Sequence, residues 1–103
     1  MLPEPSVAIP SALYLSAGAL IQLGDRARAL ERAGRALTLD PEDSAVLYNV
    51  ACVYALGGQA DEAMGCLEKA VQNGFGHRAW VENDSDFDSL REDPRFVALL
   101  EQL

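Results

Sequence analysis

The chain has 103 residues and a formal net charge of −8, and half of its residues are hydrophobic although only 7% are aromatic. This length is enough for one small domain with one modest core. The acidic balance argues against nucleic acid and anionic membranes as partners, because binding to either requires clustered lysine and arginine.

The first residues are expected to be an extended or disordered entry segment, because Pro3 and Pro5 lie within residues 1–9 and Pro10 follows. From Pro5 to Gly24 the sequence has no charged residue, which approaches the length of a membrane span. Polar residues interrupt this stretch and no basic residue precedes it. We therefore predict neither a membrane helix nor a signal peptide.

A first pair of helices is predicted next, the first from about Ser11 to Leu23 and the second capped by Asp25. The second helix has apolar residues at helical spacing, at Ala29, Leu30, Ala33, Ala36 and Leu37. Its other face carries the arginines Arg26, Arg28, Arg32 and Arg35. We interpret this arginine face as a solvated surface, with contact to an acidic partner as the alternative.

A second pair follows the connection at residues 40–43, with Asp43 or Ser44 as the predicted cap. Its first helix has apolar residues at i, i+3, i+4 and i+7, namely Leu47, Val50, Ala51 and Tyr54. The same spacing recurs at Ala60, Ala63, Met64, Leu67, Ala70 and Val71. Because Gly57 and Gly58 separate the two runs, we predict two helices joined by a tight turn. Gly74 or Gly76 is expected to end the second helix with a positive φ.

The two pairs are related by an internal repeat. When the sequence is shifted along itself so that Ala17 falls on Ala51, Gly24 falls on Gly58, Ala29 on Ala63 and Ala36 on Ala70. A period of about 34 residues with helix-turn-helix content is the signature of the tetratricopeptide repeat family, which the chain resembles. The family pattern falls at Leu47, Val50, Ala51, Tyr54, Ala63, Leu67 and Phe75 in one unit, and at Leu13, Ser16, Ala17, Leu20, Ala29, Ala33 and Pro41 in the other. Neither unit has the family tryptophan, Ser16 is polar, and Phe75 replaces the closing proline.

The resemblance implies an all-α fold, with two tetratricopeptide units in a short right-handed solenoid and a C-terminal helical closing segment. The expected boundaries are residues 1–9 for the entry segment, 10–43 for unit 1, 44–77 for unit 2 and 78–103 for the closing segment. Asp93 and Pro94 predict the start of the last helix. The apolar end of a repeat stack must be covered by a terminal element. We predict that the covering side chains are Trp80, Phe87, Leu90, Phe96 and Leu100.

The closing segment has a resemblance of its own. The pattern Asn83-Asp84-x-Asp86-Phe87-x-x-Leu90-Arg91-x-Asp93-Pro94-Arg95-Phe96 is similar to the end of tetratricopeptide regions at the C-termini of bacterial multidomain proteins. These proteins include nucleotide cyclases, protein kinases and winged-helix regulators. The similarity implies a bacterial signalling protein as the parent of this chain.

No residue set for catalysis is evident in the sequence. His77 is the only histidine, Cys52 and Cys66 lack a nucleophile signature, and the glycines do not form a phosphate-binding loop. The alternation of Asp84, Asp86 and Asp88 begins like a calcium loop, but Ser89 and Arg95 stand where glycine and glutamate are required. We therefore predict that the protein is not an enzyme and has no metal or cofactor. Unpaired cysteines favour the reducing cytoplasm.

In the family, the first helix of each unit lines a concave groove that binds partner proteins. The resemblance places the groove residues at Tyr14, Gly18, Ile21, Gln22, Tyr48, Asn49, Cys52 and Leu56. Asn49 matches a family asparagine that hydrogen-bonds the ligand backbone. Tyr14 and Gly18 replace basic residues that would bind a terminal carboxylate, so an amphipathic helix or an extended apolar peptide is the expected ligand. The alternative is that Tyr14 and Tyr48 only pack between helices.

These features predict a protein-interaction module that binds a peptide or helix on its concave face. The alternative function is self-association, including a homodimer, through an apolar helix edge at Leu13, Leu20 and Leu23. A small-ligand binder or an enzyme is a remote alternative without a residue set.

Overall fold

The computed structural model describes residues 19–103, and all regular structure in this range is helical. Residues 19–22 form a helical turn that ends at Leu23 and Gly24. The elements that follow are α2 (Arg26–Leu39), α3 (Ser44–Leu56), α4 (Ala60–Gln72), α5 (Arg78–Asn83), the 3-10 helix η1 (Ser85–Leu90) and α6 (Pro94–Gln102). The predicted all-α class is confirmed, while the predicted entry segment lies outside the described residues. In the described range, none of the helices combines the length and apolar character that crossing a bilayer requires.

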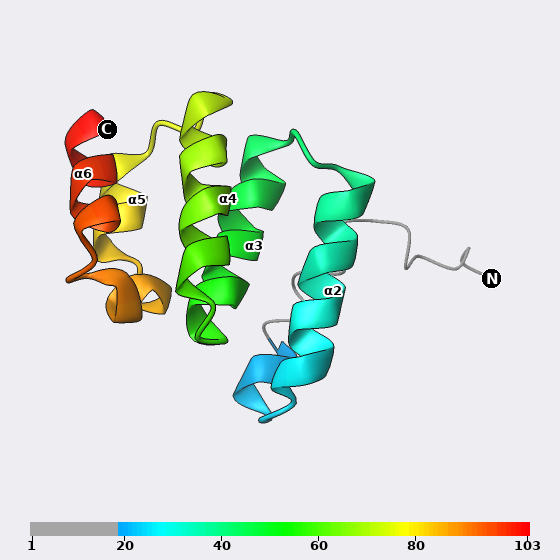
Figure 1. Ribbon diagram of the computed structural model, residues 1–103. Coiled ribbons are helices and arrows are strands. Elements are labelled where there is room, and N and C mark those ends of the chain that lie inside the picture. Colours follow the sequence, from blue (N-terminus) through cyan, green and yellow to red (C-terminus); the bar gives the residue numbers. More distant parts are fainter. Residues whose placement is uncertain (1–18) are drawn as a thin grey trace.

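The helices form two layers (Figure 1). α2, α4 and α6 succeed one another along the molecule as an outer layer, and α3 and α5 lie behind them as an inner layer. α3 packs most extensively against α4, and it also contacts α2 and η1. The outer helices α2 and α4 are therefore followed along the chain by the inner helices α3 and α5, which is the arrangement that the internal repeat predicts.

Aspartates set the starts of three helices. The side chain of Asp25 accepts a hydrogen bond from the backbone N–H of Arg28, and Asp43 accepts from those of Ala45 and Val46. Asp93 caps α6 in the same way, with Pro94 at the first helical position. Each carboxylate satisfies a backbone donor that the helix itself leaves unpaired. The predicted caps at Asp25, Asp43 and Asp93 are thus confirmed.

Small residues allow the helices to approach closely. Ala29, Ala33 and Ala36 lie at i, i+4 and i+7 on α2 and are fully buried. α3 differs from α2 because its buried residues are spread around its whole circumference. A helix that is apolar on all sides is stable only when neighbours cover every side. This requirement makes α3 the central element of the fold.

The two glycines after α3 serve different purposes. Gly58 has a φ of +79°, and Gly24, at the equivalent place in the first repeat, has a φ of +89°. Gly57 allows a close approach, because a Cβ there would lie 3.0 Å from a methyl group of Leu30. The Arg26 guanidinium donates to the carbonyl oxygen of Gly57 and adds a second link from α2 to this turn.

The closing segment covers the end of the stack as predicted at most positions. Phe87, Leu90 and Phe96 are almost completely buried, and Leu100 is partly buried against the core. The prediction for Trp80 is wrong, since this side chain is 60% exposed. Trp80 lies in the short helix α5, in which the following residue, Val81, is buried. Consecutive side chains of a helix point about 100° apart, so Trp80 and Val81 cannot both face the core. The indole of Trp80 is therefore directed out of the core.

We expect the closing segment to contribute strongly to stability through Phe87. Replacing this fully buried ring by Phe87→Ala should lower the free energy of unfolding by about 3–5 kcal/mol, because it removes apolar contacts and leaves a cavity. Urea unfolding followed by far-UV circular dichroism measures the change. Leu39→Ala, at an exposed position on α2, is the control and should cost less than about 1 kcal/mol. Equal effects of the two variants would show that the closing segment is not part of the cooperative core.

Candidate functional site

A pocket of about 410 Å³ opens between α3 and α5 in the inner layer. Its walls are the side chains of Tyr48, Ala79 and Trp80, and its polar groups come from Asn83 and Asp84. Hollows with mainly apolar walls and a few polar groups are the usual form of a binding site. This pocket is therefore the candidate functional site.

Aromatic rings hold Trp80 in place at this pocket. The imidazole of His77 stacks on the indole with ring centroids 4.6 Å apart, and the ring of Phe75 contacts the indole at 6.3 Å. Phe75 in turn stacks on Tyr48 at 4.5 Å. The exposed indole thus belongs to an aromatic cluster that reaches into the core.

A hydrogen bond joins two residues of the pocket, Tyr48 on α3 and Asp84 after α5. The hydroxyl of Tyr48 donates to Oδ2 of Asp84 at 2.7 Å, and Oδ1 of Asp84 accepts the backbone N–H of Asp86 at 3.0 Å. Tyr48 is only 6% exposed. Burial, together with the hydrogen bond to Asp84, raises the pKa of the Tyr48 phenol above its usual range. Tyr48 therefore both anchors η1 and forms a wall of the pocket.

The thiol of Cys52 lies beside the carboxylates of Asp84 and Asp86, with possible ligand atoms within 4.8 Å of one another. Such a triad can approach one cation. However, burial and then the charges of Asp84 and Asp86 raise the pKa of the Cys52 thiol. The neutral thiol is a weak ligand, because metals bind the thiolate. The group is thus better described as a concentration of acidic side chains than as a metal centre.

Two of the predicted groove residues, Tyr14 and Gly18, lie outside the described residues. Ile21 is partly buried and packs against the core, whereas Gln22 is exposed. The structure therefore brings neither Ile21 nor Gln22 into the pocket beside Trp80.

The four predicted groove residues of α3 have different surroundings. Tyr48 lines the pocket, and Cys52 is buried beside Asp84 under η1. Asn49 is partly exposed, with its amide nitrogen donating to the carbonyl oxygen of Ala45, and Leu56 is exposed at the end of α3. The ring of Tyr48 also packs against those of Phe75 and Phe87.

Trp80, Asn83 and Asp84 were not predicted as site residues from the sequence. One signal was present, because the shift that relates the first two repeats also relates Asn49 to Asn83. The structure repeats this relation, since the amide nitrogen of Asn83 donates to the carbonyl oxygen of Ala79 at 2.9 Å, as that of Asn49 does to Ala45 at 2.8 Å. Extending the period into the closing segment would have found Asn83.

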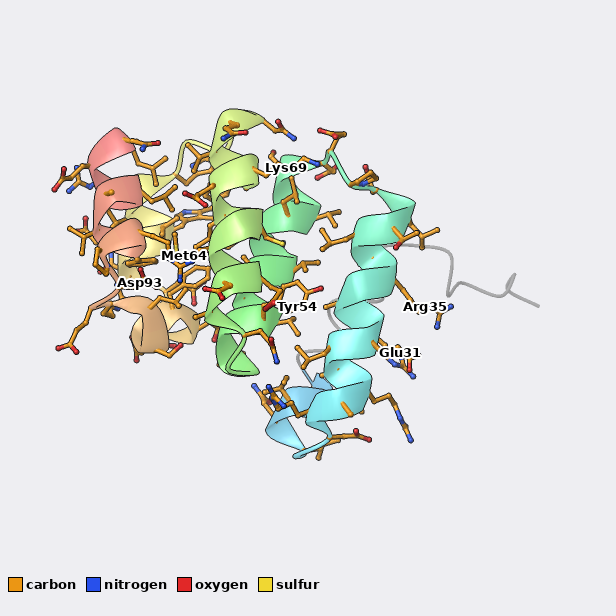
Figure 2. The ribbon with its side chains drawn as sticks, in the orientation of Figure 1. Glu31, Arg35, Tyr54, Met64, Lys69 and Asp93 are labelled. Carbon is orange, nitrogen blue, oxygen red and sulfur yellow. The ribbon has the colours of Figure 1, made fainter. Side chains whose placement is uncertain are left out.

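A second pocket, of about 320 Å³, lies between α2 and α4 with α3 beneath it. Figure 2 shows Tyr54 in this space, and burial raises the pKa of its phenol. Glu62 and Lys69 are the charged residues at its edge, and Lys69 forms an ion pair with Glu42 at 3.1 Å. The walls of this second pocket are mainly apolar, and the charge of Lys69 is paired with Glu42. The pocket therefore offers less for selecting a ligand than the one beside Trp80.

The arginine face of α2 points away from α4 at Arg35 and at the neighbouring Glu31 (Figure 2). Arg28 forms an exposed ion pair with Asp25 at 3.5 Å, and Arg26 binds the Gly57 carbonyl. Exposed pairs of this kind contribute little to stability. Contact between this face and an acidic partner stays a prediction.

Comparison with known proteins identifies the repeat. A family model described as tetratricopeptide repeat matches residues 12–81, which is more than half of the chain. No curated protein and no solved structure matches.

The buried Cys52 predicts that stability falls in alkaline solution. Its thiol keeps its proton in the folded state, whereas an unfolded thiol loses it above about pH 8.5. The unfolded state then binds fewer protons, so the free energy of unfolding falls as the pH rises, by up to about 1.4 kcal/mol per pH unit for each such group.

Urea unfolding at several values between about pH 8.5 and pH 10 tests this dependence. Cys52→Ala should show a shallower decline than the unaltered protein. Tyr48→Phe is the control and should keep the full decline, because an unfolded phenol titrates only above about pH 10. The same slope in Cys52→Ala and in the unaltered protein would contradict the prediction.

Proposed function

The chain belongs to the tetratricopeptide repeat family, whose repeats generally mediate protein–protein interaction, and we propose that it holds a peptide or helix of a partner protein on its inner layer. The proposed site is the pocket between α3 and α5. In this proposal the protein is a non-catalytic interaction module. Units 10–43 and 44–77 form the scaffold, and residues 78–103 close it and supply part of the site.

The exposure of Trp80 is the observation that supports this function. A side chain of this size is costly to leave in water, yet the indole is 60% exposed at the edge of a pocket. Its contacts with His77 and Phe75 hold it in one place, so little conformational entropy is lost when a ligand covers it. Tryptophan in such a setting is the residue type most often found at the energetic centre of interfaces.

The two repeated asparagines support binding of a backbone. Asn49 and Asn83 each use the amide nitrogen within their own helix, which leaves the amide oxygen as an acceptor. An extended peptide offers backbone N–H donors at regular intervals. In the proposal, Asn49 and Asn83 accept hydrogen bonds from such a peptide.

The non-catalytic role rests on the state of the potential reactive groups. Burial raises the pKa of the Cys52 thiol and raises that of the Cys66 thiol to about 11. A nucleophilic cysteine needs the opposite shift. The imidazole of His77 stacks on Trp80, and among the described residues no hydrogen bond joins it to a nucleophile.

Selection of peptides from a random display library, followed by calorimetric titration of a selected peptide, tests this function. Trp80→Ala should weaken binding by at least about thirtyfold, as expected for a central interface tryptophan. The exposed position of Trp80 predicts little change in the free energy of unfolding. Val97→Ala, which removes an exposed apolar side chain from α6, is the control and should bind as the unaltered protein does. Undiminished binding by Trp80→Ala would place the site elsewhere.

Self-association is a second candidate function, because Leu23 is 82% exposed in the turn before α2. Leu20 is partly buried, and Leu13 lies outside the described residues. Covering Leu23 with a second copy would remove this apolar surface from water.

Light scattering over a hundredfold range of concentration tests this second candidate. We expect a dimer mass at the highest concentration and a monomer mass for Leu23→Ser under the same conditions, since the serine no longer gains from burial. A monomer mass for the unaltered protein throughout the range would rule out self-association.

A further inference from the structure

The polar side of the pocket carries a carboxylate, that of Asp84. Asp84 is partly buried and accepts hydrogen bonds from the Tyr48 hydroxyl, from the Asp86 N–H and, at 3.8 Å, from the Cys52 thiol. An ionised carboxylate has about four acceptor positions, so these three bonds leave room for a further donor. Within residues 19–103 no ion pair involves Asp84.

The neighbouring arginines are engaged elsewhere. Arg91 donates to the backbone carbonyl oxygens of Glu82 and Asp84 and forms an ion pair with Asp88 at 3.2 Å. Arg78 forms an ion pair with Glu82 at 3.0 Å. The positive charges of Arg78 and Arg91 therefore stabilise α5 and the chain that follows it, and in the described part of the chain no cationic side chain forms an ion pair with the carboxylate of Asp84.

Further negative charge surrounds this carboxylate. The carboxylate of Asp86 lies within 4.8 Å of that of Asp84, and burial followed by the charge of Asp84 raises the pKa of Asp86. Over the whole chain, all but three of the 16 acidic residues follow Leu39, but only half of the eight basic residues do. The part of the molecule that forms the pocket is thus strongly acidic, and such a surface attracts cations.

The remaining groups of the pocket suit a planar cation. The indole of Trp80 has exposed surface, and tryptophan is the best aromatic partner for a cation. The amide oxygen of Asn83 is a second acceptor close to Asp84 in the chain. A guanidinium group stacks on aromatic rings and donates several hydrogen bonds in one plane, whereas an ammonium group is a compact point charge.

We infer that the pocket between α3 and α5 binds an arginine side chain of the partner, stacked on Trp80 and paired with Asp84. This inference rests on the proposed function and specifies the chemistry of the partner, a peptide that carries arginine. The acidic surface favours additional basic residues on either side of that arginine.

The experiment uses peptides selected from a random display library and then synthesised in two forms. One form carries the selected arginine, and the other carries citrulline, which keeps the shape of the side chain and removes its charge. Calorimetric titration of the full chain should show that citrulline weakens binding at least about tenfold. Raising the salt concentration should weaken the arginine peptide more than the citrulline peptide.

Asp84→Asn is the matching protein variant, since its amide oxygen can accept the Asp86 N–H and its amide nitrogen can donate to the hydroxyl oxygen of Tyr48. In this variant the difference between arginine and citrulline should shrink to about threefold or less. Glu92→Gln, at an exposed site in the same acidic region, removes the same charge and should keep the full difference. Urea unfolding of both variants verifies that they are folded.

The possible results separate this inference from the proposed function. Selected peptides that lack arginine, or citrulline peptides that bind equally well, would overturn the inference and leave the interaction function standing. Lysine peptides with equal affinity would overturn the assignment of a guanidinium group. If no peptide binds to the unaltered protein, the proposed function itself fails.

Discussion

The fold depends on the need to cover α3 on every side. Its buried residues surround the helix axis, so α2 and α4 alone leave part of its surface exposed to water. η1 covers that part through Phe87, and the Tyr48 hydroxyl fixes it there through Asp84. The closing segment is therefore needed by the apolar pattern of the preceding repeat, and the pocket forms where this segment meets α3.

Features set by neighbouring residues could be predicted from the sequence. The caps at Asp25, Asp43 and Asp93 and the turn at Gly58 depend on bonds within a few residues, and the repeat period places the apolar stripes. The site was harder to predict, because the bond between Tyr48 and Asp84 joins residues 36 positions apart. The direction of Trp80 also depends on how a six-residue helix sits on the stack, and no local pattern contains that information.

The pocket shows how one set of side chains serves both packing and recognition. Tyr48 stacks on Phe75 and meets Phe87 edge to face, while another part of its surface lines the pocket. Asp84 likewise has two roles, since it caps η1 and also supplies the polar side of the pocket. A substitution at Tyr48 or Asp84 therefore changes stability and recognition together, whereas Trp80 and Asn83 are exposed, so that a substitution there changes recognition more than stability.

The position of Trp80 also determines how the protein absorbs and emits ultraviolet light. It is the only tryptophan of the chain, and it lies outside the core in partial contact with water. Indole emission depends on the polarity around the ring, so in this protein the emission reports on the pocket and only weakly on the packing of the helices. The molecule thus carries an intrinsic optical probe at its pocket.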